Sequence, residues 1–248
     1  MSKQAVPDVI TNDDVKEIKH FYDNVYHANA EGEHADFSSH YSALYRRLGI
    51  QQGSRVLDVA CGTGGWLQIC HDSGCEVSGV DISDRAIDLC RERLPSGAFH
   101  AQPAETLPFE ENSFNLVSCL GSLEHFIDPL ACLMEMRRVA KPHALLVILV
   151  PNKDFLTRKL GLFGGTYQVD AKEVVRTLPE WQALFHAAGL NVQERWRDLH
   201  VLNRHWIMRG SKASWPLRFA QAAALPFWPL KWQYQVYHRC SIQSHGGD

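Results

Sequence analysis

Two acidic residues and the glycine-rich turn between them are the part of this sequence best suited to chemistry. Asp58 lies in a short apolar stretch and is followed by Val-Ala-Cys-Gly-Thr-Gly-Gly, and Asp81 stands about 20 positions after Gly62. A strand, a glycine turn, a helix and a second strand that ends in an acid form the first βαβ unit of a Rossmann-like sheet. Because the second acid of such a unit binds ribose hydroxyls, the pattern predicts a site for a cofactor that carries a ribose.

The details of the turn argue against a dinucleotide. A dinucleotide fingerprint has a third glycine three positions after the second, where this chain has Leu67. A pyrophosphate at the helix N-terminus would also lie close to the negative charge of Asp58. An acid at this position is better suited to a ligand with an ammonium group and a sulfonium, and S-adenosylmethionine carries both.

Five motifs in order resemble those of one enzyme family. They are residues 58–65, 79–83, 104–109 with 112–117, 123–129 and 135–142. In this order they are similar to the motifs of class I S-adenosylmethionine-dependent methyltransferases, in particular to the small-molecule and quinone-type members. One glycine turn would be weak evidence, but five ordered motifs over about 100 residues are specific.

The resemblance implies a set of residues that contact the methyl donor. They are Tyr22, Asp58, Ala60, Gly62, Gly64, Asp81, Ile82, Ala104, Glu105 and Leu120. Structural alternatives exist for several of them. The two aspartates could be surface acids or helix caps, the glycines could only permit a tight turn, and Glu105 could cap a turn instead of lying near the adenine.

Three positions depart from the family pattern. Ala60 replaces the usual glycine of the first motif, and His143 stands in a turn where a glycine pair is common. Pro103 replaces the acid that accepts a hydrogen bond from the adenine amino group. Proline has no side-chain acceptor, so we expect another group, such as Gln102, to serve the adenine.

His125 is the predicted catalytic base. It follows the fourth strand at the carboxyl end of the sheet, where such folds bind ligands, and its ordinary pKa of about 6.5 suits proton removal near neutral pH. The alternative is that His125 only packs at a helix start or shapes the pocket. Glu124 and Asn152 are weaker candidates for binding substrate. We expect no metal site, because His20 and His27 share a helix face without a further ligand at suitable spacing.

Helices and strands alternate along the middle of the chain. The predicted helices are residues 65–72, 84–93, 129–138 and 178–188, and the predicted strands after the first are 76–80, 98–101, 114–119, 144–150, 190–197 and 233–240. This alternation predicts an α/β fold, a Rossmann-like, doubly wound, mostly parallel seven-stranded sheet with helices on both faces. The resemblance implies that the last strand is antiparallel and lies between the fifth and sixth.

The chain divides into four predicted parts. Residues 1–48 form a helical cap over the cofactor pocket, 49–198 the cofactor-binding core, 199–232 an aromatic and basic insertion, and 233–248 the final strand and tail. Within the cap, the apolar spacing predicts a helix over 12–26, from which Tyr22 or Tyr26 could touch the donor. We expect a mobile flap over 28–40 and a short helix over 42–48.

The insertion combines aromatic residues with cations. From residue 199 to 247 there is no Asp or Glu, and the cations are Arg204, Arg209, Lys212, Arg218, Lys231 and Arg239. Three interpretations remain open: a lid over the substrate, a membrane-surface segment, and a dimer contact or plain extension of the core. The cations are too scattered to predict a nucleic-acid site.

Composition limits the remaining possibilities. A net charge of −3 gives no general attraction to nucleic acid or membranes. Seven cysteines without a Cys-x-x-Cys pair indicate reduced thiols, and residues 1–10 lack the features of a signal peptide, so we expect a cytoplasmic protein.

The leading hypothesis is methyl transfer from S-adenosylmethionine to a small-molecule acceptor, through a hydroxyl of a sugar, quinone or secondary metabolite. One alternative is a membrane-surface methyltransferase of a lipid-soluble ring. Another is a non-catalytic binding module or regulator that keeps the fold, and a dehydrogenase that uses a nucleotide cofactor is a distant fourth. A homodimer is also possible.

Overall fold

A seven-stranded sheet runs through the computed structural model, which describes residues 12–26, 38–159, 161, 173–200 and 215–243. The strands lie in the order β3-β2-β1-β4-β5-β7-β6. Their bounds are β1 Arg55–Val59, β2 Glu76–Asp81, β3 Ala98–Ala101, β4 Phe114–Leu120, β5 Ala140–Pro151, β6 Leu190–Arg197 and β7 Gln235–Ile242. The strands β1 to β5 pair in parallel, and β7 pairs antiparallel with both β5 and β6. The predicted Rossmann-like sheet and the inserted antiparallel strand are confirmed.

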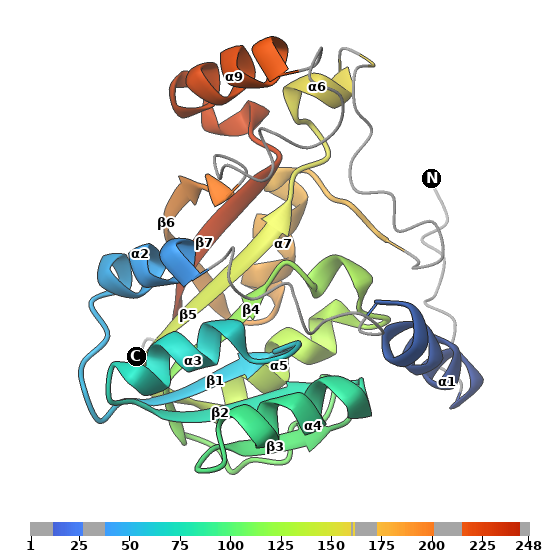
Figure 1. Ribbon diagram of the computed structural model, residues 1–248, viewed down its shortest axis with the longest axis vertical. Helices are drawn as coiled ribbons and strands as arrows, with labels where there is room; N and C mark the ends of the chain where they lie inside the picture. Colours follow the sequence, from blue (N-terminus) through green and yellow to red (C-terminus); the bar gives the residue numbers. More distant parts are fainter. Residues whose placement is uncertain (1–11, 27–37, 160, 162–172, 201–214, 244–248) are drawn as a thin grey trace, which may run out of the picture.

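Helices cover both faces of this sheet (Figure 1). They are α1 Asn12–Phe21, α2 Ser38–Leu48, α3 Gly65–Asp72, α4 Asp84–Arg93, α5 Pro129–Val139, α6 Leu156–Lys159, α7 Leu178–Ala187 and α9 Trp215–Ala224. Shorter turns of helix are η1 Tyr22–Tyr26, η4 Leu123–His125, η7 Leu225–Phe227 and η8 Leu230–Trp232. Among the described residues, no helix is long and apolar enough to cross a bilayer.

The buried side chains form two apolar clusters, one on each face. The first joins α5 and α7 to strand residues such as Leu57 and Ile148. The second joins α2, α3 and α4 to the intervening strand residues, such as Val56 and Val147. Because successive side chains of a strand point to opposite faces, apolar runs without alternation supply both clusters at once. All seven cysteines are buried and free, as expected for reduced thiols.

Two segments differ from the prediction. The helix α2 begins at Ser38, inside the segment predicted to be a flap, and its early turn is held by a hydrogen bond of 2.8 Å between His40 and Tyr237. That contact joins residues 197 positions apart, so no local pattern could reveal it. The helix predicted over 12–26 changes from α to π geometry at Tyr22. A π turn of this kind is frequent at functional sites.

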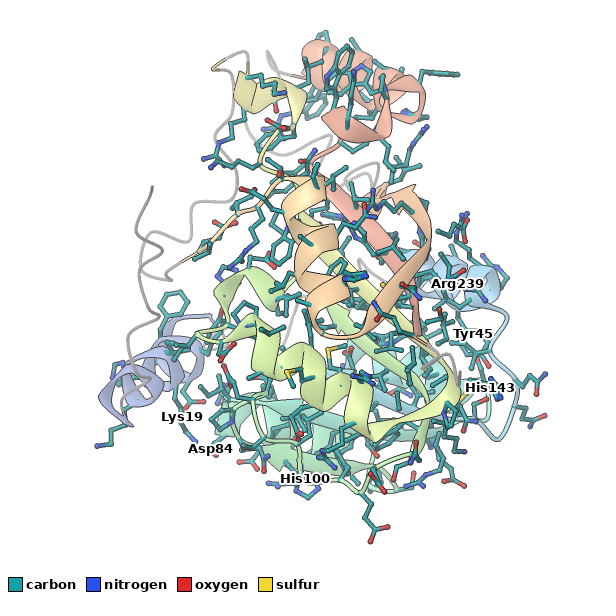
Figure 2. All side chains as sticks on the ribbon, turned by 180° about the vertical axis from the view of Figure 1, so that it is seen from behind. Lys19, Tyr45, Asp84, His100, His143 and Arg239 are labelled. Atoms are coloured by element: carbon teal, nitrogen blue, oxygen red, sulfur yellow. The ribbon has the colours of Figure 1, made fainter. Side chains whose placement is uncertain are left out.

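The described part of the insertion lies at the end of the sheet toward which β5 points. There α9 lies beside α6, as both views of the molecule show (Figures 1 and 2). The side chain of Asn152 donates to the carbonyls of Lys231 and Gln233, and Gln233 donates to that of Leu225. These hydrogen bonds from buried amide side chains attach the insertion to the end of β5.

Trp181 anchors α7 to the sheet. Its ring is fully buried, and its Nε1 donates to the carbonyl of Pro151 at 2.8 Å. The helix itself starts with a capping box, in which Thr177 and Glu180 bond each other's backbone N–H. Trp181 therefore ties the end of β5 to the helix that covers it.

We predict that Trp181→Phe lowers the free energy of unfolding by roughly 2–4 kcal/mol, because it leaves a cavity and an unbonded buried carbonyl. Urea denaturation measures this loss. The control Trp232→Phe, at a partly exposed position in η8, should cost less than about 1 kcal/mol. Equal losses for the two variants would contradict the anchoring role.

Candidate functional site

A cavity of about 570 Å³ opens at the carboxyl edge of the sheet. Of the residues predicted to contact the donor or the reacting group, those that line it are Tyr22, Asp58, Ala60, Gly62, Asp81, Ile82, Ala104, Glu105, Leu120 and His125. They come from η1 and from the ends of several strands, which meet because parallel strands present their carboxyl ends at one edge. Only Gly64 of the predicted set does not line the cavity.

The glycine turn is held in shape by Asp81. The backbone N–H of Gly62 donates to Asp81 Oδ2 at 2.8 Å, and that of Ser83 donates to Oδ1 at 3.0 Å. Asp81 is buried at the end of β2, so one carboxylate connects the turn after β1 to the start of α4. An ionised carboxylate is an acceptor with about four lone-pair positions, and Asp81 also lines the cavity.

The turn also explains the residue types found in it. Gly64 has a φ of 80° and precedes α3, and a Cβ there would lie 2.9 Å from the Sγ of Cys90. Its role is therefore in the backbone and in packing. Ala60 has a φ of 59°, in the left-handed region that disfavours a side chain. The replacement of the family's glycine by Ala60 thus costs backbone strain of about 1–2 kcal/mol at the edge of the cavity.

Asp58 is a buried acid in the wall of the cavity. Its Oδ1 accepts from the hydroxyl of Ser118 at 2.6 Å, and Ser118 in turn accepts from the indole N–H of Trp66 at 3.0 Å. Burial raises the pKa of Asp58 to about 8, against the smaller opposing effect of the Ser118 bond, and the nearby Asp81 raises it further. Near neutral pH the free protein thus holds a protonated acid that a bound cation would ionise.

The N-terminal helix lies against the start of α4, beside the cavity. Lys19 forms an ion pair of 2.6 Å with Asp84, and the two side chains lie close together in Figure 2. Asp23 accepts from the hydroxyl of Ser83 at 2.6 Å. These contacts bring Ile18 and Tyr22 into the cavity wall. The side chain of Tyr26, the other tyrosine predicted to touch the donor, lies outside the described residues.

The predicted adenine end contains Gln102, Pro103, Ala104 and Glu105. The side chain of Gln102 donates to the carbonyl of Thr106, which leaves its amide oxygen as the end that can accept a hydrogen bond. Glu105 accepts from the backbone N–H of Asp128 at 3.3 Å. Glu105 therefore bonds the residue that precedes α5, and it also faces the cavity.

His125 ends η4 and faces the cavity beside a buried acid. Its Nε2 lies 3.9 Å from Oε1 of Glu124, whose pKa burial raises to about 8. Glu124 itself does not line the cavity, and neither does Asn152, whose side chain is occupied by backbone groups. Of these three candidates on the acceptor side, only His125 can meet a ligand in the cavity.

Sequence reasoning missed a second polar group in the same cavity. It consists of His40, Asp198, His200 and Tyr237, which come from α2, the segment after β6, and β7. Asp198 contacts both histidines. No sequence signal marks this group beyond the position of Asp198 at the end of a strand, because the chain brings its members together only through the sheet.

Comparisons with known proteins agree with the geometry. A family model described as a methyltransferase domain matches residues 33–195. The demethylmenaquinone methyltransferase of Staphylococcus aureus (strain MRSA252) is 38% identical over 120 residues, which are 46% of this chain and 49% of that protein. The chain therefore spans about half the length of the curated relatives it matches.

Solved structures share the fold at low sequence identity. A SAM-dependent methyltransferase from Aquifex aeolicus has a TM-score of 0.58 at 15% identity, over 94% of this chain and all of that one (100%). The 1,6-didemethyltoxoflavin-N1-methyltransferase of Burkholderia thailandensis, solved with 1,6-didemethyltoxoflavin and S-adenosylhomocysteine, has a TM-score of 0.64 at 16% identity, over 98% and 93%.

The sheet order, the acid-flanked glycine turn and the family match agree with one another. The chain belongs to the methyltransferase-domain family.

Proposed function

We propose that this chain binds S-adenosylmethionine and transfers its methyl group to a small-molecule acceptor. The observation that carries the proposal is the buried pair of acids around the glycine turn, in a chain of this family. Asp58 offers a protonated carboxyl that an ammonium group would ionise, and Asp81 offers acceptors for a ribose. A pyrophosphate would meet two acids there and no matching cation in the turn itself.

We assign roles to most of the remaining predicted residues from their positions. Gly62 and Ala60 would allow the ligand to approach the backbone, and Ile82 would pack against it beside Asp81. Ala104 and Glu105 would meet the adenine, and Leu120 would lie beside the methyl end. Tyr22 would cover the ligand from η1. In this proposal residues 1–48 act as the cap of the cofactor pocket, and 49–198 as the binding core.

The chemistry needs alignment and, for a hydroxyl acceptor, a base. S-adenosylmethionine supplies a methyl group on a sulfonium, which is already an activated leaving group. Holding the acceptor in line with it is worth about 7–11 kcal/mol of the barrier. We assign proton removal to His125, because it faces the cavity at the end of β4. General-base assistance contributes roughly 10²–10⁴-fold.

The relatives bear on the class of acceptor. The Staphylococcus aureus relative is named for demethylmenaquinone, and the Burkholderia thailandensis structure holds 1,6-didemethyltoxoflavin. Both names describe ring compounds, and Tyr41, Trp66 and Tyr237 give the cavity of this chain aromatic walls that would suit a planar ring. We therefore propose a planar ring as the acceptor.

We predict that S-adenosylhomocysteine binds to this chain. At pH 7 its binding should release about one proton per site, which comes from Asp58. The sign follows from the raised pKa of about 8, since the free acid is mostly protonated at pH 7 and the ligand's ammonium favours the ionised form. Above about pH 9 the release should vanish. Calorimetry in two buffers of different ionisation enthalpy measures the released proton.

Asp58→Asn should abolish this proton release. The matched control is Glu124→Gln, which removes another buried acid of pKa about 8 that does not line the cavity, and it should leave the release unchanged. The same titration with NAD should give no heat. If S-adenosylhomocysteine does not bind, the non-catalytic alternative is favoured, and if NAD binds instead, the assignment of the donor is wrong.

We predict that His125→Ala lowers methyl transfer by roughly 10²–10⁴-fold without changing the affinity for S-adenosylhomocysteine. Transfer of labelled methyl into a fractionated cell extract measures turnover and also identifies the acceptor. The control is His143→Ala, which changes an exposed histidine near the start of β5, at the end of the molecule away from α6 and α9 (Figure 2). This variant should transfer labelled methyl at the same rate as the unchanged protein. Full turnover in His125→Ala would remove the base role.

A second candidate is methyl transfer at a membrane surface. Phe227 of η7 is 86% exposed and Phe219 of α9 is 54% exposed, and Arg218 and Lys231 lie in the same part of the chain, which has no acid. Exposed rings with cations suit the headgroup region of an anionic bilayer. This role for residues 199–232 competes with a lid and with a dimer contact.

For this candidate we predict that the protein sediments with anionic phosphatidylglycerol vesicles and is released by high salt, because each cation near the surface adds about 1 kcal/mol. Replacing Phe219 and Phe227 with Ser should weaken sedimentation. Met134→Ser, which removes a side chain that is 53% exposed on α5, should not. If the two Phe replacements instead change the oligomeric state, the segment is a dimer contact.

A further inference from the structure

Gln235 lies in the cavity wall at the start of β7. Because β7 runs antiparallel to its neighbour β5, its first residue lies at the edge of the sheet where the parallel strands end. Gln235 pairs with Pro151, and it shares a face of β7 with Tyr237, which also lines the cavity. The reversed direction of β7 therefore places a polar side chain among the carboxyl ends of the other strands.

The amide of Gln235 lies beside Gly121, the residue that follows β4. The backbone N–H of Gly121 donates to the carbonyl of Leu149 at 3.0 Å, and both residues line the cavity. A Cβ at Gly121 would lie 3.8 Å from Nε2 of Gln235, so the amide nitrogen is close to the backbone between Leu120 and His125. In the proposed function these last two residues lie at the methyl end and at the reacting group. The amide of Gln235 is thus near the place of the methyl acceptor.

The side chain of Gln235 is not used to hold the fold. It makes no hydrogen bond within the described ranges, while its backbone carbonyl accepts from the N–H of Asp198 at 3.2 Å. Gln102, another glutamine of the cavity, instead donates to the carbonyl of Thr106. A half-buried amide without a protein partner keeps its N–H donors and its oxygen for a ligand.

The charges of the cavity limit what this amide can meet. Four acids line the cavity, and its described lining residues include no Lys or Arg; the acids are Asp58, Asp81, Glu105 and Asp198. Carboxylates repel an anionic ligand, and in the ionised form they accept hydrogen bonds but donate none. A neutral ligand that carries an acceptor atom therefore needs a donor such as the amide of Gln235.

We propose that Gln235 determines specificity for the methyl acceptor, because its Nε2 donates to a carbonyl oxygen on a neutral, planar ring. This proposal rests on the proposed function and deepens it by adding a carbonyl to the ring. The carbonyl is separate from the atom that receives the methyl group, which lies toward His125. A ring with a CH2 group in place of the carbonyl offers no acceptor to Nε2 and loses this hydrogen bond.

The test uses two matched probes, 1-indanone and indane, which differ only in a carbonyl that replaces a CH2 group. Ligand-observed NMR titration with S-adenosylhomocysteine present gives both dissociation constants for each protein. Gln235→Met keeps the length of the side chain and removes its amide. It should lower the affinity for 1-indanone relative to indane about fivefold, the usual effect of one hydrogen bond. The ratio isolates this bond, because a general loss of packing would weaken both probes alike.

Gln193→Met is the matched control. It makes the same exchange at an exposed position of β6 that does not line the cavity, and it should keep the ratio of the unchanged protein. Gln235→Glu replaces the amide nitrogen by an oxygen, which accepts but does not donate, and should lower the ratio at least as far as Gln235→Met does. Thermal unfolding shows that each variant is folded.

Three results would overturn the proposal. Neither probe binds to the unchanged protein, Gln235→Met keeps the ratio, or Gln235→Met weakens binding of S-adenosylhomocysteine and leaves the ratio unchanged, which would place Gln235 at the donor. The proposed function can fail separately. A ratio that changes in Gln235→Met but not in Gln193→Met, in a protein that does not bind S-adenosylhomocysteine, would support the bond from Gln235 to the carbonyl and reject the proposed function.

Discussion

The bond between the carboxylate of Asp81 and the backbone of Gly62 is the contact on which the site depends. It crosses from the end of β2 to the turn after β1, and the same carboxylate holds the start of α4 through Ser83. A glycine turn alone has many conformations, and this bond selects one of them. The shape of the cavity at the carboxyl edge follows, since the neighbouring walls are built on the two strands that Asp81 connects.

Burying Asp58 beside Asp81 stores an electrostatic cost in the free protein. Burial forces the carboxyl of Asp58 toward its neutral form, as its raised pKa indicates. A cationic ligand would relieve this cost, so part of the affinity would come from the protein's own unfavourable state. The positive φ of Ala60 adds a local backbone strain at the same edge of the cavity.

The cavity joins two groups with different origins in the chain. The acids and the turn belong to the βαβ unit and lie within about 25 residues of each other, as is general for such units. The histidine group comes from α2, the segment after β6, and β7, which lie outside this unit. A shared fold can therefore keep the end with the acids and the turn constant while the other end differs between proteins, which is why the fold alone does not identify a substrate.

The amino-acid sequence by itself determined the α/β class, most element bounds, and the two acids and the glycine turn at one end of the cavity. Those features depend on local periodicity and on short motifs. The glycine turn that follows Asp58 is such a motif, and the strand predicted over residues 190–197 has the same bounds as β6. Only the tertiary structure decided that Glu124 and Asn152 do not line the cavity, and that His40 meets Tyr237 across 197 positions. Such contacts arise when strands distant in the chain pair within one sheet, and no pattern within a single segment encodes them.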